Sequence, residues 1–375
     1  MRATFHLGRL WGIRIGMHWS VLAVVVLLVF GVGFARFPLA YPGYGAVAYL
    51  VSGVAAAVAF LASLVAHEMA HALVARREGQ EVEGITLWMM GGLASLKGQF
   101  RDPGAEFRIA GVGPLTSGLV AVLFGIVTWL VVVADGPALV SGVPAYLALI
   151  NLVLAAFNLV PAAPLDGGRI LRAALWRRWD DRHRATVVTS RLGRGFGFGL
   201  VLLGVVGLLA GAGGGLWWVL IGLFIVLAAG AEQWQAEVGA ALAGVRVRDV
   251  MTPRPDVADG ARSVDMFLRD TALVRRHSAF PLVDDAGRVE GMITLNRLKS
   301  VPPELRETTT LREVACPPEE IPFAAPDDSL PELMSAMNGC SDGRALVFDQ
   351  GALVGIVSPT DVSRAVTLRG LDARQ

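Results

Sequence analysis

The stretch SLVAHEMAHALVARR (residues 63–77) places two histidines and a glutamate at the end of a long apolar run. Ionisable side chains are costly in the hydrocarbon core of a bilayer, and those found there usually serve a function. The positions of His67, Glu68 and His71 therefore need an explanation, and the surrounding sequence provides the context for it.

The composition is that of an integral membrane protein. The 375-residue chain is 54% apolar and 17% charged, which is above the apolar share and below the charged share of soluble domains. We therefore expect contact with the lipid bilayer. The net charge of +1 gives no reason to expect a nucleic-acid partner. Cys316 and Cys340 form no metal-type pair and suggest no disulfide framework, so reduced thiols in a cytoplasmic setting are expected.

Six segments are long and apolar enough to cross a bilayer. They are 17–35, 46–75, 107–134, 139–160, 196–212 and 215–231. The stretch ITLWMMGGLASLKG (85–98) is apolar but too short to span, and its double glycine and β-branched start predict an extended or re-entrant segment. The predicted fold is thus an α-helical polytopic membrane domain of six transmembrane helices with one such β segment.

Basic residues gather in alternate loops, and this bias sets the orientation of membrane helices. They occur in the N-terminal leader and after the second and fourth spans, whereas the opposite loops carry only Arg36. We therefore predict a multi-pass protein of the cell membrane with cytoplasmic N- and C-termini. The first apolar run lacks a small-residue cleavage site and follows a 16-residue leader, so it is predicted to be retained.

HEMAH (67–71) has the H-E-x-x-H pattern of zinc-dependent hydrolases. Histidines four residues apart share one helix face, where two imidazoles can bind one Zn²⁺. Glu68, one step round the helix, can take a proton from water and pass it to a leaving amine. In a soluble chain the pattern could arise by chance on a solvated face, but its position in an apolar run favours the metal.

A catalytic zinc site usually has three protein ligands, so the chain must supply another. The best candidate is Asp166 in FNLVPAAPLDGGRIL (157–171), which follows the fourth span on the same predicted side as the end of the second. Pro161 and Pro164 break the helix there. Asp166 could instead be the N-cap of a helix that begins near Arg169, and spacing alone leaves both roles open.

HEMAH in a membrane helix, followed much later by FNLVPAAPLDGGR, resembles the site-2 protease family of intramembrane zinc metalloproteases, and in particular the branch with C-terminal CBS domains. The similarity includes GMHWS (16–20), GGLASL (91–96) and GVGPLTSG (111–118). It implies one zinc ion per chain, held by His67, His71 and Asp166, with Glu68 as the general base. It also implies that Asn158 holds substrate or an oxyanion, although an interhelical hydrogen bond is the alternative.

The resemblance further implies the reaction. Such proteins cut single-span membrane proteins, such as a membrane-bound regulator, within or near the membrane after earlier trimming, which is regulated intramembrane proteolysis. The extended segment around Gly91 and Gly92 is expected to pair with an unwound substrate as an added strand. His18 is expected to be a structural histidine at the membrane interface and not a ligand.

The C-terminal part contains a repeat in which VRDVMTPRP, from residue 247, is matched by LREVACPPE, from residue 311. Each copy reads as strand, helix, strand, hairpin, strand, helix and resembles a CBS motif. We expect a membrane domain over 1–235, a linker over 236–246, and a soluble α/β module of two CBS motifs over 247–302 and 309–370. The resemblance implies that this pair regulates the protease by binding an adenine nucleotide; the alternative is that it only forms a homodimer or packs against the protease.

The nucleotide pattern in CBS motifs is a serine or threonine followed three residues later by an aspartate that binds ribose. The second copy has it in Ser358 and Asp361, whereas the first has Thr294 followed by Arg297. One site is thus expected to be complete and the other is in doubt. The main alternative function for the whole chain is a CBS-regulated ion transporter, and Glu68 between the two histidines favours hydrolysis over it.

Overall fold

The computed structural model describes residues 4–372 except 90, 98–101, 212, 276, 285 and 338, and side chains at 83, 93–97 and 370–372 are also not described. The chain folds as two compact units, Met1–Ala236 and Glu237–Gln375. Arg2 and Arg101 of the predicted basic loops lie outside the described residues, as do Met90 and Gly98 of the predicted extended segment.

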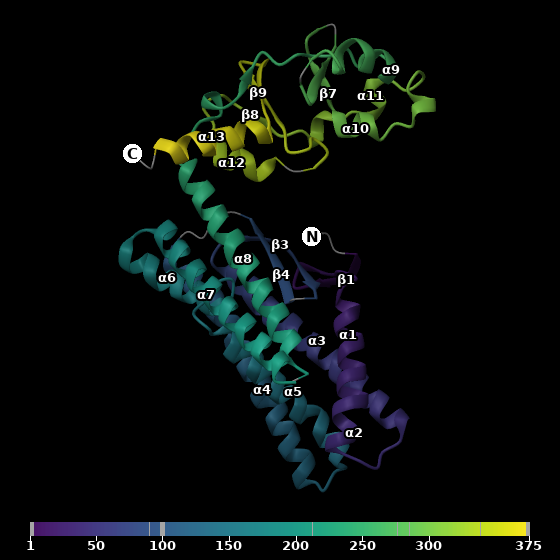
Figure 1. Cartoon of the computed structure of the whole chain (residues 1–375), viewed down its shortest axis with the longest axis vertical. Helices are drawn as coiled ribbons and strands as arrows, with labels where there is room; N and C mark the ends of the chain where they lie inside the picture. Colours follow the sequence, from purple (N-terminus) through teal and green to yellow (C-terminus); the bar gives the residue numbers. More distant parts are fainter. Residues whose placement is uncertain are drawn as a thin grey trace. The chain divides into compact units, whose positions relative to one another are not determined.

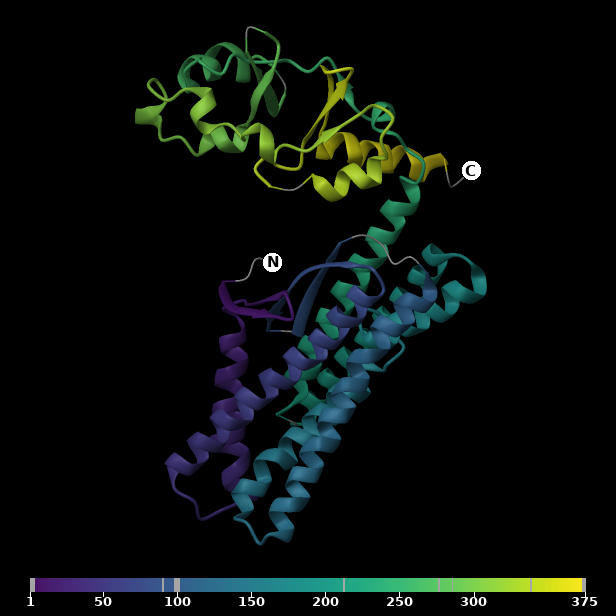
Figure 2. The ribbon, with the colours of Figure 1, turned by 180° about the vertical axis from the view of Figure 1, so that it is seen from behind.

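The first unit is built from helices that can cross a membrane (Figure 1). In the described part of the chain there are six such spans, as predicted. The first comprises α1 (Val21–Phe30), a π-helical turn (Gly31–Arg36) and α2 (Phe37–Ala40); the others are α3 (Ala46–Arg77), α4 (Pro103–Val133), α5 (Ala138–Asn158), α7 (Arg182–Leu209) and α8 (Gly215–Ala241). The shorter α6 (Asp166–Trp179) precedes α7. α4 and α5 pack against each other along the bundle (Figure 2).

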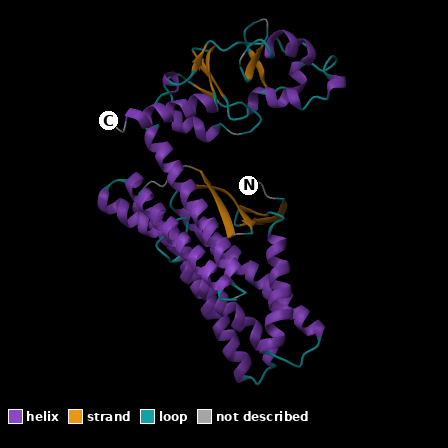
Figure 3. Cartoon of the chain, in the orientation of Figure 1, coloured by secondary structure: helices purple, strands orange, loops and turns teal. Residues whose placement is uncertain are grey.

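A four-stranded sheet lies at the end of the bundle where α3 leads into β3 (Figure 3). Its order is β1-β2-β3-β4, with bounds Phe5–Leu10, Ile13–Met17, Glu81–Trp88 and Gly91–Lys97. β2 and β3 are parallel, whereas the two outer pairs are antiparallel. The predicted extended segment is thus confirmed as the β3–β4 hairpin. The hairpin formed by β1 and β2 was not predicted.

Apolar side chains join the sheet to α3. Ile13, Ile85 and Leu87 are buried against Met69 and Ala72 of that helix. Burial of such side chains stabilises the contact by about 1.5–3 kcal/mol each. The sheet therefore packs on the half of α3 that carries His67, Glu68 and His71.

His18 connects the sheet to the first span. Its backbone N–H donates to the carbonyl of Leu87 at 2.8 Å, and its Nδ1 lies 2.9 Å from the hydroxyl of Ser20. The Ser20 hydroxyl also accepts from the backbone N–H of Met89. These contacts support a structural role for His18.

The second unit has two small sheets, β6-β7 and β5-β10-β9-β8. Its strands are β5 (Thr252–Pro253), β6 (Ala279–Val283), β7 (Val289–Thr294), β8 (Phe323–Ala324), β9 (Ala345–Asp349) and β10 (Ala352–Val357). Its helices are α9 (Val264–Phe267), α10 (Leu295–Lys299), α11 (Leu311–Val314), α12 (Leu330–Ala336) and α13 (Pro359–Asp372). The order of elements in each repeat follows the predicted pattern.

The two repeats exchange backbone pairs. β5 belongs to the first repeat by sequence but pairs with β10 of the second. In return, Cys316 at the start of the second repeat pairs with Met292 of β7. Each copy therefore completes the other's sheet, which explains why the two CBS motifs fold as one module.

The cysteines correct one expectation. Cys316 and Cys340 are joined in a disulfide, with Cα atoms 5.4 Å apart, so the expectation of two reduced thiols is wrong. The sequence offered no spacing signal because strand exchange brings residue 316 to a shared apolar cluster with Cys340. Glu320 lies beside the pair, but two sulfurs bonded to each other do not supply the thiolates that a metal needs.

Candidate metal centre

Three buried side chains from distant parts of the chain meet inside the first unit. Nε2 of His67 and Nε2 of His71 lie 3.1 Å apart, and each lies 3.3 Å from Oδ2 of Asp166. All three residues are at most 9% exposed. The two histidines come from successive turns of α3, and Asp166 is the first residue of α6.

The spacing of these donor atoms fits a tetrahedral metal. Zinc binds histidine nitrogen and carboxylate oxygen at about 2.0–2.1 Å, so neighbouring ligand atoms of a tetrahedron are about 3.3 Å apart. The three measured separations, 3.1, 3.3 and 3.3 Å, match that edge. Three protein ligands of this type leave a fourth position for water or substrate, which is typical of a catalytic zinc site.

One face of α4 orients both rings. Nδ1 of His67 lies 2.9 Å from the hydroxyl of Ser117, and Nδ1 of His71 lies 2.6 Å from the carbonyl of Ile109. A metal-binding histidine usually uses its other ring nitrogen in this way, which fixes the ring and its tautomer. The carbonyl can only accept, so His71 is protonated at Nδ1 and presents Nε2 to the metal. Ser117 lies in the GVGPLTSG stretch, but no pattern in the sequence identifies it or Ile109 as a partner of the histidines.

Gly113 of α4 leaves room for the metal. It lies midway between Ile109 and Ser117 on the same helix face. A Cβ at this position would overlap Nε2 of both His67 and His71. The space beside the donor atoms is therefore kept free by the absence of a side chain.

The loop before α6 sets the position of Asp166. The N-cap of α6 is Leu165, so the alternative of Asp166 as N-cap is wrong. A Cβ on Gly167 or Gly168 would overlap the backbone of residues 159–163, so two glycines let the first turn pack directly on that loop. The first turn of α6 holds the buried carboxylate of Asp166 against both histidines, with Oδ2 at 3.3 Å from each Nε2.

Glu68 lies under strand β4. A Cβ on Gly92 would overlap Cγ and Cδ of Glu68 and lie 2.7 Å from its Oε1. The glutamate of the motif is thus half-buried between α3 and the backbone of β4. β4 stands at the end of the described sheet order, so its outer edge is the side on which another strand could pair.

The predicted residues of the second unit contact one another or their neighbours. The carboxylate of Asp361 accepts from the hydroxyl of Ser358 at 2.6 Å and from that of Thr252 at 3.3 Å. Thr294 is buried and donates to Asp342 at 2.5 Å. A cavity of about 450 Å³ lies beside Asp342, lined by Asn296, Arg297, Ser300, Glu313, Val314, Cys340 and Asp342.

Gly113→Ala should abolish metal binding, because its methyl group competes for the space between the two imidazoles. Gly111→Ala is the matched control on the same helix, since a Cβ there meets nothing within 4 Å. The measurement is zinc per chain by elemental analysis of the purified, folded variants. Full zinc occupancy in Gly113→Ala would contradict the site geometry.

Comparison with known proteins agrees with this picture. The model of peptidase family M50 matches residues 55–143 and 130–202, and the CBS domain model matches 247–304 and 311–368. Rip3 of Mycobacterium tuberculosis, which bears the name of a zinc metalloprotease, is 42% identical over 98% of this chain and 93% of its own length. sll0528 of Synechocystis sp., which is named in the same way, is 28% identical over 98% of this chain and 96% of its own.

A site-2 protease structure from Methanocaldococcus jannaschii covers 61% of this chain and 94% of its own, at 27% identity and a TM-score of 0.42. Similarity to Rip3 over nearly the whole of both chains, together with the family match around the three donor residues, does not favour the alternative of an ion transporter. The chain belongs to peptidase family M50, as a zinc metalloprotease of the site-2 protease type with a C-terminal pair of CBS domains.

Proposed function

We propose that this chain hydrolyses peptide bonds of single-span membrane proteins within or near the bilayer, with one zinc ion held by His67, His71 and Asp166 and with Glu68 as the general base. The observation that carries the proposal is the triangle of three donor atoms at tetrahedral spacing, with a glutamate and the edge strand β4 beside it. The residue roles rest on this arrangement, and the substrate class rests on membership of the family.

Zinc, when bound, supplies a Lewis acid that polarises the scissile carbonyl and makes water acidic enough to react near neutral pH. The chain's own contribution is proton transfer. Glu68 takes a proton from the attacking water and delivers it to the nitrogen of the leaving amide. Because Glu68 directly follows His67 on α3, its carboxylate is held at the edge of the three-ligand cluster by the same helix.

Strand β4 supplies a place for the substrate. The backbone N–H and C=O groups of a transmembrane helix are hydrogen-bonded within the helix. When a segment of the helix unwinds inside the membrane, these groups need other hydrogen-bond partners. The outer edge of β4 offers backbone N–H and C=O groups, and an extended peptide can add to it as a further strand. Gly92 brings this strand against Glu68, so a paired peptide would lie close to the base.

The register of α5 on α3 supports a role for Asn158. The amide of Asn151 donates to the hydroxyl of Ser63 at 3.3 Å, which fixes the level of one helix against the other. Alternate spans run in the same direction. Asn158 of α5 follows Asn151 by seven residues, and Ala70 of α3 follows Ser63 by seven, which is about 10.5 Å along each helix. This register places Asn158 near the level of Ala70, between the two histidines of the motif. We propose that its amide faces substrate beside the metal and stabilises the oxyanion.

The basic loops support a position in the cell membrane with both termini in the cytoplasm. That orientation predicts that protease added outside intact cells leaves the second unit uncut.

Glu68→Gln should keep full zinc occupancy and lose cleavage, because the amide keeps the shape of the side chain but cannot accept the proton. Proton transfer of this kind contributes about 10²–10⁴-fold to rate. The assay is cleavage of a purified single-span substrate in detergent, with a zinc chelator as the second arm. Activity that survives both the substitution and the chelator would rule out zinc-dependent hydrolysis at this site.

Gly92→Ala should lower the cleavage rate while zinc remains bound, since the added methyl group displaces the Glu68 carboxylate and not a metal ligand. Gly111→Ala, with open space at its Cβ, is again the control. The comparison is between zinc content and single-turnover rate in the same preparation. An unchanged rate would show that β4 does not constrain the base.

We further propose that the CBS pair regulates the protease by binding an adenine nucleotide, with Ser358 and Asp361 on the ribose. Calorimetry of the full chain with ATP, ADP and AMP should show binding that Asp361→Ala weakens and Asp349→Ala does not. No heat with any nucleotide would leave a dimerisation or packing role, in which Thr294 and Asp361 serve only the contacts described above.

A further inference from the structure

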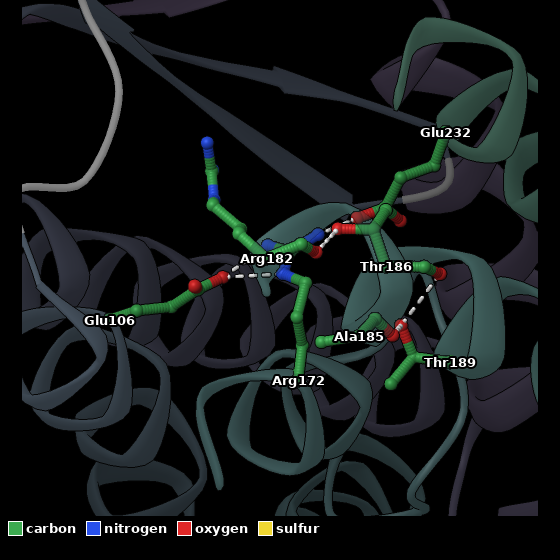
Figure 4. Close-up of polar contacts among 7 residues, drawn as sticks. All are labelled: Glu106, Arg172, Arg182, Ala185, Thr186, Thr189 and Glu232. Atoms are coloured by element: carbon green, nitrogen blue, oxygen red, sulfur yellow. Dashed lines mark hydrogen bonds and ion pairs between the residues drawn. The ribbon is translucent and has the colours of Figure 1, made fainter. Parts of the chain in front are cut away.

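A buried cluster of charged side chains joins three helices of the first unit (Figure 4). Arg172 of α6 donates through Nε to Oε1 of Glu106 in α4 at 2.7 Å, and its Nη2 donates to the same oxygen. Its Nη1 donates to Glu232 of α8. The side chains of Glu106 and Arg172 are 0% and 7% exposed, and that of Glu232 is 25% exposed.

Such a cluster is costly as a source of stability alone. The free-energy cost of removing buried ions from water often exceeds the energy of their attraction. Replacing a buried ion pair with apolar residues is therefore often neutral or stabilising. Arg182, the first residue of α7, lies beside the cluster (Figure 4) and interacts electrostatically with its three members. A buried contact among three helices instead offers geometric precision, because Nε and Nη2 of one planar, rigid guanidinium group converge on a single carboxylate oxygen.

The helices that the cluster joins are those that build the metal centre. α6 begins with Asp166, six residues before Arg172. Glu106 lies three residues before Ile109, on the same face of α4 that holds the two imidazoles through Ile109 and Ser117. The contact between Glu106 and Arg172 therefore sets the position of the helix that carries the carboxylate relative to the helix that orients both rings.

We propose that Arg172 is a positioning residue for Asp166, clamped by Glu106 on one side and Glu232 on the other. This inference rests on the proposed ligand set. Metal ligands must lie within about 0.2 Å of their ideal distances. Along the chain, α6 is joined to α5 only by the loop of residues 159–165, so a further contact is needed to fix the position of Asp166. The clamp on the second turn of α6 keeps its first residue at the correct distance from His67 and His71.

The test uses the full chain in detergent, loaded with Zn²⁺ or with Co²⁺, whose visible absorption reports the geometry of its ligands. Arg172→Met should weaken zinc binding about 10–100-fold, as loss of residues that orient ligands usually does, and should change the Co²⁺ spectrum. Arg178→Met is the matched control, since Arg178 is an exposed arginine on the same helix, and it should change neither.

Two further variants separate positioning from folding. Arg172→Lys keeps the charge but cannot make the forked contact, and Glu232→Gln removes the charge of the most exposed member; both should give intermediate zinc affinities. Thermal unfolding of the metal-free proteins is measured in parallel. If Arg172→Met does not fold, these two variants decide the question.

Folded variants with wild-type zinc affinity and an unchanged Co²⁺ spectrum would overturn the proposal and leave the cluster as a purely structural contact. Asp166→Ala in the same assay tests the ligand set independently. If that variant retains full zinc binding, the proposed function fails at this residue. If it loses zinc whereas the Arg172 variants do not, only the positioning role fails.

Discussion

The first unit depends on a single requirement: two imidazole nitrogens and one carboxylate oxygen must lie at tetrahedral spacing although they come from α3 and α6. Neither helix achieves this alone. α4 provides the common support, because Ile109 and Ser117 hold the rings while Glu106 binds Arg172 of α6. The position of α4 within the bundle is therefore a functional constraint as well as a packing one.

The site also depends on missing side chains. Gly113 leaves the space for a metal, and Gly92 lets β4 approach Glu68. Gly167 and Gly168 let α6 start directly against its own preceding loop. Protein interiors are close-packed, so one methyl group at such a point must displace something. These glycines explain why GVGPLTSG, the double glycine of β4 and LDGG accompany the histidine motif in the sequence.

The chemistry and the spans could be predicted from the sequence because both leave local signals. The spacing of HEMAH fixes a helix face, and apolar length fixes a span. α7 begins fourteen residues before its predicted start because its first turns are polar and rich in arginine. The β1–β2 hairpin was missed because short strands next to a membrane helix have no strong pattern of their own.

Contacts between distant residues left no signal of that kind. Ser117 could not be recognised as a partner of His67, nor Cys340 as a partner of Cys316, because each pairing exists only after helices or strands have packed. The same holds for Glu106, Arg172 and Glu232. Each would be predicted as an ordinary solvated charge, and only the fold buries them together.

The length of α3 explains how water can reach a site in a membrane helix. Its 32 residues extend about 48 Å at 1.5 Å per residue, well beyond a hydrocarbon core of about 30 Å. His71 lies six residues, about 9 Å, before the basic end at Arg77. His67 and His71 thus lie in the last third of α3, near its basic end, where the sheet packs against the helix. A substrate helix would have to unwind only near its end to reach them, and the strand edge that would receive it lies at that same level.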